Sequence, residues 1–158
     1  MLKGLLEKSS CAKCRICCGF DQTDIWEMPV FSKEAKEKLE EKLGHIEFIR
    51  QGDSYTVKPS ELHGEELFYC PALDRDTGCI LGDEKPFDCR IWPYRIMEVG
   101  GKRAITISPV CPELYSRPLN SLVEFLERGL KNEIFSYADK NPDVVKPYDK
   151  SYPVLMFE

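Results

Sequence analysis

The chain has 158 residues and a formal net charge of −5 at pH 7, with 22 lysines and arginines against 27 aspartates and glutamates. This length predicts one domain with a substantial buried core. An acidic chain without a basic run repels nucleic acid and anionic membranes, so we expect neither as a partner.

No membrane-spanning helix is expected, because no stretch of about 18 residues is free of charged side chains. The first residues, Met1 to Lys8, lack the unbroken apolar region of a signal peptide. We therefore expect the protein in the cytoplasm, where cellular reductants keep thiols reduced.

The first predicted element is a short helix over residues 11–18, capped by Ser9 or Ser10 and ended by Gly19. A helix advances about 100° per residue, so the thiols on it would fall within one arc of about 120°. These thiols are Cys11, Cys14, Cys17 and Cys18. One helical face would then present all four to the same place.

Residues 20–31 are expected to be irregular or a short strand, with Trp26, Met28 and Phe31 as core candidates. The next segment, residues 33–43, has the start and stop signals of a helix, with Ser32 before it and Gly44 after it. Its few apolar residues recur every four positions, which predicts a solvated helix resting on a narrow stripe.

Two hairpins are predicted. Residues 46–50 and 55–58 flank a turn at 51–53. After a loop at 59–66 and a turn-rich stretch at 67–89, residues 90–99 and 103–108 flank the glycine turn at 100–102. In the second hairpin, Cys89 and Arg90 would begin the first strand.

Residues 119–137 repeat apolar side chains at helical spacing, which predicts an amphipathic helix packed on the core. Residues 141–158 contain three prolines and are expected to form an extended tail on the surface. Together these elements predict an α+β fold. It would be a small single domain over residues 1–140, organised around a cysteine-rich metal site with its motif core at 11–112.

Eight cysteines dominate the chemistry of the chain. Thiolates are strong ligands for zinc and for iron–sulfur clusters. Structural disulfides are the less favoured interpretation, because the expected compartment is reducing and a bond between the neighbours Cys17 and Cys18 would be strained. Ordinary buried thiols are the third interpretation. We expect metal ligation by all eight: Cys11, Cys14, Cys17, Cys18, Cys70, Cys79, Cys89 and Cys111.

The spacing Cys11-x-x-Cys14-x-x-Cys17 is typical of iron–sulfur sites, in which a remote cysteine followed by proline supplies the fourth ligand. Two such residues are present, Cys70 before Pro71 and Cys111 before Pro112. A [4Fe–4S] cluster on the N-terminal triple and one of these two is therefore favoured. The other thiols would be structural or would complete a second site.

Zinc is the alternative metal. Zinc fingers usually show paired C-x-x-C motifs, and only the N-terminal group has close spacing here. Arg90 is a candidate to bind the cofactor by donating hydrogen bonds to sulfur. His45 and His63, the only histidines, are weaker candidates to replace a cysteine ligand. No catalytic residue can be named from the sequence.

Several separate motifs follow one another in a fixed order. They are Cys11-x-x-Cys14-x-x-Cys17-Cys18-Gly19, Cys70-Pro71-Ala72-Leu73, Thr77-Gly78-Cys79-Ile80, Lys85-Pro86-Phe87-Asp88-Cys89-Arg90-Ile91-Trp92-Pro93 and Cys111. This order resembles that of the YkgJ-type cysteine-cluster family, whose members are described as zinc- or iron-chelating domains. It is also similar to a pattern in flagellin lysine methylases, where it is linked to an iron–sulfur centre.

The resemblance implies metal binding and leaves the reaction open, since the family has no settled one. We therefore expect a metal-binding protein, with an iron–sulfur cluster favoured and a redox or accessory role beside a protein partner. A zinc-stabilised interaction module and a component of a methyl-transfer system are the alternatives.

Overall fold

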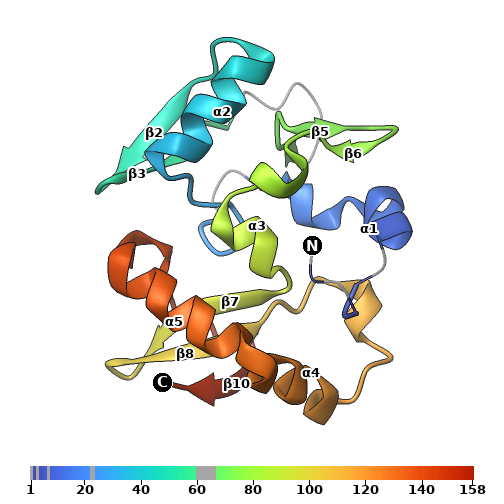
Figure 1. The fold of residues 1–158 in the computed structure, drawn as a ribbon, viewed down its shortest axis with the longest axis vertical. Coiled ribbons are helices and arrows are strands. Elements are labelled where there is room, and N and C mark those ends of the chain that lie inside the picture. The colour runs from blue at the N-terminus through green and yellow to red at the C-terminus, as the bar shows by residue number, and fades with distance from the viewer. Residues whose placement is uncertain (1, 3, 7, 22–23, 60–66) are drawn as a thin grey trace.

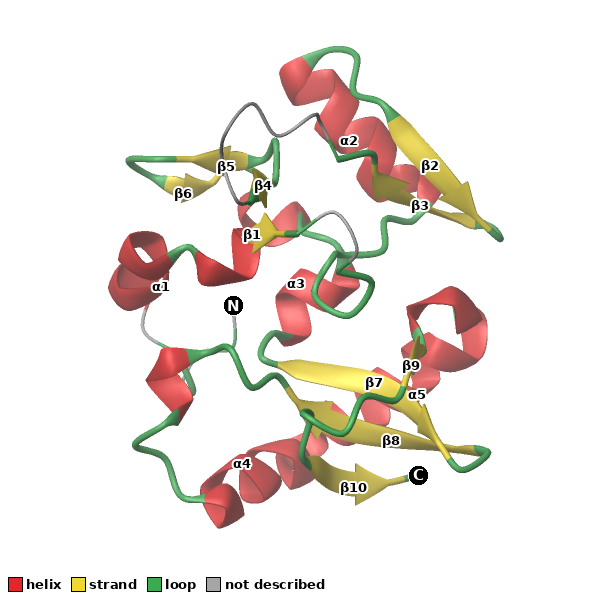
Figure 2. Ribbon diagram, turned by 180° about the vertical axis from the view of Figure 1, so that it is seen from behind, coloured by secondary structure: helices red, strands yellow, loops and turns green. Residues whose placement is uncertain are grey.

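The computed structural model describes residues 2, 4–6, 8–21, 24–59 and 67–158. A four-stranded sheet in the order β10-β8-β7-β9 lies in the lower half of the molecule as drawn (Figures 1 and 2). Strands β7 (Tyr94–Val99) and β8 (Lys102–Ile107) form the predicted second hairpin. Gly100 and Gly101 both have positive φ at its turn, a conformation that glycine adopts without strain.

The C-terminal segment corrects the expected surface tail. Strand β9 (Lys146–Pro147) pairs in parallel with β7, and β10 (Val154–Phe157) pairs antiparallel with β8. A 3₁₀ turn, Pro142–Val144, precedes them. Pro147 fits because β9 lies at the edge of the sheet, where a strand tolerates a residue without an N–H. Residues 141–158 therefore belong to the domain.

The predicted amphipathic helix is present but divided. Helix α4 (Leu119–Phe125) continues through a π-helical segment, Leu126–Leu130, into α5 (Lys131–Lys140). Gly129 has a φ of 118° inside the π segment, which kinks the axis there. The two views show α4 and α5 on one face of the sheet (Figures 1 and 2). Leu122 of α4, Leu126 of the π segment and Ile134 of α5 are buried in the same hydrophobic cluster as the sheet.

Helix α3 (Phe87–Ile91) corrects the expectation that Cys89 and Arg90 begin a strand. Pro86 precedes it, and the Cys89 N–H donates to the Pro86 carbonyl over 3.0 Å. Pro86 is the residue before the first turn and has an extended ψ of 153°, so the helix begins at Phe87.

The other half of the molecule contains α2 (Lys33–Leu43) and the hairpin of β2 (Phe48–Gln51) and β3 (Ser54–Val57). Both predictions are confirmed. The Ser32 hydroxyl accepts from the Ala35 N–H, and Gly44 ends the helix. Of the apolar stripe, Leu39 is buried while Leu43 is 44 % exposed. The expected loop at 59–66 lies outside the described residues, apart from Pro59.

The N-terminal helix is shorter than expected. Helix α1 (Lys8–Cys14) ends at Arg15, which has a φ of 58°, and a separate 3₁₀ turn covers Ile16–Cys18. The four N-terminal thiols therefore do not share one continuous helical face. Short antiparallel pairs follow, joining β1 (Gly19–Phe20) to β4 (Phe68–Tyr69) and β5 (Leu73–Asp74) to β6 (Gly78–Cys79).

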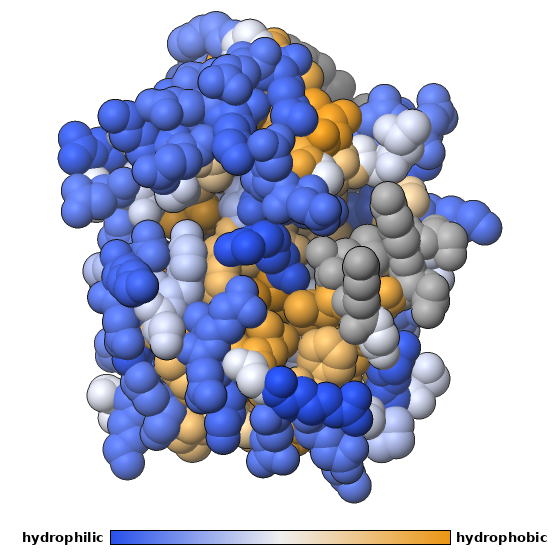
Figure 3. Space-filling view, in the orientation of Figure 1, coloured by the Kyte–Doolittle hydropathy of each residue, from blue (hydrophilic) through white to orange (hydrophobic). Residues whose placement is uncertain are grey.

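Two hydrophobic clusters form the core. The larger joins the sheet, α3, α4 and α5, and the smaller joins α2, β3, β4 and the residues beside β5 and β6. Met28 and Phe31 are buried as expected, and Trp26 is half-buried. In Figure 3 the charged face of α2 is blue, with apolar side chains gathered below it across the middle of the molecule.

The predicted α+β class of a small domain is confirmed by these elements. Within the described part of the chain, no helix is long and apolar enough to cross a membrane.

Candidate metal centre

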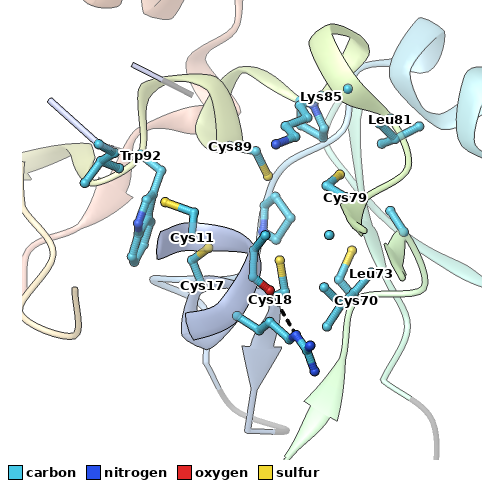
Figure 4. A pocket seen from close by; sticks show the side chains of 18 of the residues that line it. Cys11, Cys17, Cys18, Cys70, Leu73, Cys79, Leu81, Lys85, Cys89 and Trp92 are labelled. Carbon is cyan, nitrogen blue, oxygen red and sulfur yellow. Dashed lines mark hydrogen bonds between the residues drawn. The ribbon is translucent and has the colours of Figure 1, made fainter. Parts of the chain in front are cut away.

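A cavity of about 600 Å³ is lined by residues from both hydrophobic clusters, and cysteine sulfurs gather in its wall (Figure 4). The lining thiols are Cys11, Cys17, Cys18, Cys70, Cys79 and Cys89. They come from α1, the 3₁₀ turn after it, the loop between β4 and β5, β6 and α3. All eight cysteines of the chain are free thiols.

Arg15 determines how the N-terminal thiols are arranged. Its left-handed backbone breaks the helix between Cys14 and Cys17, and the Cys18 N–H then donates to the Arg15 carbonyl over 2.9 Å. The Arg15 Nε–H donates back to the Ala12 carbonyl over 3.1 Å. A non-glycine residue in this conformation is uncommon and is held here by these local bonds.

Backbone pairing brings the middle cysteines to the same wall. The Cys70 N–H donates to the Cys18 carbonyl over 2.8 Å, next to the β1–β4 pair. Cys79 lies opposite Leu73 in the β5–β6 pair, and the Leu73 N–H donates to the Cys70 carbonyl over 2.9 Å. Residues 18, 70 and 79 are therefore linked through a short series of backbone contacts.

The tight turn between β5 and β6 is held by Asp74. Its Oδ1 accepts from the Asp76 and Thr77 N–H groups and from the Thr77 hydroxyl. Gly78 follows with a φ of 85°, and a Cβ built on it would lie 3.7 Å from the Ala12 Cβ. The turn thus carries Cys79 against helix α1.

Cys14 and Cys111 do not line the cavity. Cys111 is buried at the start of a 3₁₀ turn, Pro112–Leu114, and packs in the larger cluster, against which Cys11 and Cys17 also pack. Cys14, at the end of α1, is half-buried. Both thiols contribute to raising the pKa of Cys11.

Burial raises the pKa of several thiols in this region. The pKa of Cys11 rises to about 11 through burial and the nearby Cys17, Cys111 and Cys14. Burial and then Cys79 and Cys17 raise that of Cys70 to about 12, against a hydrogen bond from the Ala72 backbone. Cys89, half-buried in the cavity wall, has its pKa raised well above the ordinary value, chiefly by burial. A metal must displace these protons when it binds.

Cys17 behaves differently from the other buried thiols. A hydrogen bond from its neighbour Cys18 lowers the pKa of Cys17 to about 7, against the opposing effect of burial, and the Arg95 charge acts in the same direction. The same hydrogen bond raises the pKa of Cys18 strongly. The vicinal pair thus consists of one thiol that ionises readily and one that does not.

The cavity wall also holds cations that the sequence did not single out. Arg95 and Lys85 line the cavity, and Arg95 is 3 % exposed. Burial works to lower the Arg95 pKa, but the carboxylates of Glu27 and Asp88 raise it above its ordinary value, so Arg95 stays charged. Arg95 lies among the apolar residues of β7, and a charged residue in such a strand could have indicated a buried ion pair.

Arg90, the residue predicted to bind the cofactor, is exposed and does not line the cavity. Its guanidinium lies 5.3 Å from the centre of the Phe87 ring. A hydrogen bond from Arg90 to sulfur stays a prediction. His45 is exposed, and His63 lies outside the described residues.

The cysteine sulfurs are suitable ligands for a thiolate-bound metal, but the side chains are not arranged as they would be around a bound metal ion. In the described ranges, no three or more histidine, cysteine or carboxylate side chains are grouped so that they could hold a metal ion as they stand. The cavity wall otherwise combines apolar side chains, such as Phe20, Phe31 and Trp92, with three buried or half-buried cations, Arg15, Lys85 and Arg95.

No protein-family model matches this chain, and no curated protein or solved structure matches it either.

Proposed function

We propose that this chain is a metal-binding protein of the YkgJ type, whose thiolates hold iron–sulfur, with [4Fe–4S] as the favoured form. The observation that carries the proposal is the gathering of six thiols from separate segments around one cavity. Cysteines needed only for packing would be distributed through the core like other small apolar residues.

The surroundings of the cavity favour a cluster. Apolar side chains beside the half-buried thiols limit their contact with water, and buried positive charge offsets the negative charge of several thiolates. Arg95 supplies such a charge in the wall. Hydrogen bonding, burial and nearby charge also set the reduction potential of a cluster. A redox or accessory role beside a protein partner follows from this proposal.

Metal binding would also stabilise the fold. The lining thiols lie on segments from Cys11 to Cys89, so a shared centre would close long loops of the chain. Closing such loops lowers the conformational entropy of the unfolded state, and the free energy of metal binding adds to the free energy of folding.

A zinc-stabilised interaction module is the second candidate, favoured by the donor set itself. Thiolates alone complete a closed structural zinc site, which needs no open coordination position. Such a protein would be colourless and would lose stability on treatment with a strong chelator.

The test is anaerobic purification followed by analysis of iron, zinc and acid-labile sulfide, with a visible absorption spectrum of the same sample. The proposal predicts a brown protein with iron and sulfide in equal amounts. Zinc without colour would support the second candidate, and a protein without metal would contradict both.

Two variants sharpen this test. Cys14→Ser should abolish the colour of the cluster on the N-terminal triple, because Cys14 belongs to that triple. His45→Ser is the matched control, since His45 is exposed, and it should keep the spectrum of the wild type. A fully coloured Cys14→Ser protein would remove Cys14 from the ligand set.

A further inference from the structure

Resting on the proposed function, the structure assigns the eight cysteines to two separate metal sites of four thiols each. The first thiol group is Cys11, Cys14, Cys17 and Cys111. The second thiol group is Cys18, Cys70, Cys79 and Cys89. The division passes between the neighbours Cys17 and Cys18.

The packing of the core is the first argument for this division. Cys11, Cys17 and Cys111 belong to or pack against the larger hydrophobic cluster, the one built on the sheet. Cys70 and Cys79 pack against the smaller cluster around α2 and the β2–β3 hairpin. The two sets of thiols are therefore held by two different parts of the core.

The backbone contacts give the same division. Cys18 is joined to Cys70 by the 2.8 Å hydrogen bond between their main chains, and Cys79 is joined to Cys70 through Leu73. Figure 4 shows the sulfurs of Cys18, Cys70, Cys79 and Cys89 around one part of the cavity. Cys11 and Cys17 lie together beside Trp92 in the same view.

Packing and position in the chain place the two thiols that do not line the cavity. Cys111 is buried in the larger cluster, against which Cys11 and Cys17 also pack. Cys14 follows Cys11 by three residues on α1, so the two lie on one face of that helix. Cys17 comes directly before Cys18 on the 3₁₀ turn and therefore lies closest to the boundary between the groups.

The vicinal pair explains how one segment serves two sites. Arg15 turns the chain out of α1, so Cys17 and Cys18 lie on a separate 3₁₀ turn. Cys17 packs back toward α1 and the larger cluster, while the Cys18 main chain pairs with Cys70. Ligation requires the thiols of each group to turn toward a common centre, and χ1 is the torsion that directs each cysteine sulfur.

The division also selects between the two remote Cys-Pro residues. Cys111 joins the N-terminal triple, giving the spacing typical of an iron–sulfur site. Cys70 joins the second group, which has no short spacing between its members in the sequence. The second site is thus formed only by the folded chain, and its thiols can hold zinc or a second cluster.

The most direct test loads the wild-type protein with an NMR-active cadmium isotope and correlates each cadmium signal with cysteine β-protons. Cadmium binds thiolates as zinc does, so the measurement reports thiol grouping without any substitution. Two signals are expected, each correlated with the four cysteines of one group. One cadmium signal correlated with both Cys11 and Cys70 would overturn the assignment. So would a result in which Cys18 is correlated with the first thiol group and Cys17 with the second.

A second measurement uses two matched variants, Cys111→Ser and Cys70→Ser, each purified anaerobically with its native metal. Each should lose the metal of its own group, and mass spectrometry after alkylation should find only the three remaining thiols of that group modified. Modification of all the remaining thiols in either variant would overturn the division into two sites.

These outcomes separate this inference from the proposed function. A wild-type protein that binds neither native metal nor cadmium contradicts both. A protein that binds metal with all its thiols correlated to one signal retains the proposed function and contradicts only the two-site assignment.

Discussion

Arg95 and Glu27 form a buried ion pair beside the cavity, with 2.8 Å between Nη2 and Oε2 and side chains only 4 % and 6 % exposed. Glu27 Oε1 also accepts from the hydroxyls of Ser108 and Tyr152. The Arg95 guanidinium lies 4.5 Å from the centre of the Trp92 ring. This network fixes a positive charge in the wall that faces the thiols.

Removing the Arg95 charge should destabilise the protein strongly. Arg95→Met leaves Glu27 buried without its partner, which costs about 3–5 kcal/mol for pairs of this kind. The matched control is Arg103→Met, since Arg103 pairs with Asp139 and Glu158 at the surface. That change should cost about 1 kcal/mol or less. Urea unfolding of both variants measures the difference, and equal costs would contradict a structural role for the buried pair.

A second buried cation gives the protein a pH-dependent stability. Lys146 is 5 % exposed, and its ammonium donates to the Met28 carbonyl over 2.9 Å. Burial lowers its pKa below 10.5, against the opposing influence of Asp88. In the range between the lowered pKa and 10.5, the unfolded chain therefore binds more protons than the folded chain at this site.

The contribution of Lys146 to stability must rise with pH across that range, because stability rises wherever the unfolded state binds more protons. The Lys146→Met variant lacks the pH-dependent free energy that the ionisation of Lys146 contributes. The free energy of unfolding of the wild type should therefore increase relative to that of the variant as the pH approaches 10.5, and the difference should level off above it. Denaturant unfolding of both proteins at a series of alkaline pH values checks this, and parallel profiles would show that the Lys146 pKa is not lowered.

Two glycines test how the β2–β3 hairpin is attached to the C-terminal segment. Gly52 and Gly100 share a φ of 59°, so alanine at either position carries the same backbone strain. A Cβ on Gly52 would lie 2.6 Å from Asp143 Oδ1, whereas nothing lies within 4 Å at Gly100. The Asp143 carboxylate also accepts from the Asp53 N–H over 3.0 Å.

Gly52→Ala should therefore displace the Asp143 side chain and break this hydrogen bond, which adds a cost of about 0.5–1.5 kcal/mol beyond that of Gly100→Ala. Thermal unfolding of the two variants compares them directly. Equal melting temperatures would mean that Asp143 does not attach the hairpin to the C-terminal segment.

Local signals in the sequence predicted α2 and the turns of the two hairpins well, whereas Ser9 and Ser10 lie within α1 and not at its start as predicted. Ser32 and Gly44 gave the bounds of α2, because capping depends only on neighbouring residues. The glycine pair at 100–101 likewise indicated the turn of the central hairpin. The helix break at Arg15 could not be predicted, because a non-glycine residue with positive φ has no reliable signal in its own sequence.

The pairing of segments far apart in the chain could not be predicted from the sequence. The prolines at 142, 147 and 153 indicated an extended tail, yet the Trp26 indole donates to the Pro147 carbonyl and β9 pairs with β7. The indole contact joins residues more than a hundred positions apart, and the strand pairing joins Met97 to Lys146. The same limit applied to the candidate site. The sequence named the thiols but gave neither their neighbours nor the buried charges of Arg95 and Glu27.

The central claim is that the cysteines of this chain bind metal in two groups of four. The most direct measurement is the intact mass of the anaerobically purified protein, recorded under native conditions and again after acid denaturation. The account predicts a native mass larger than that of the chain by two metal centres, both lost on denaturation. A native mass equal to that of the bare chain would contradict it.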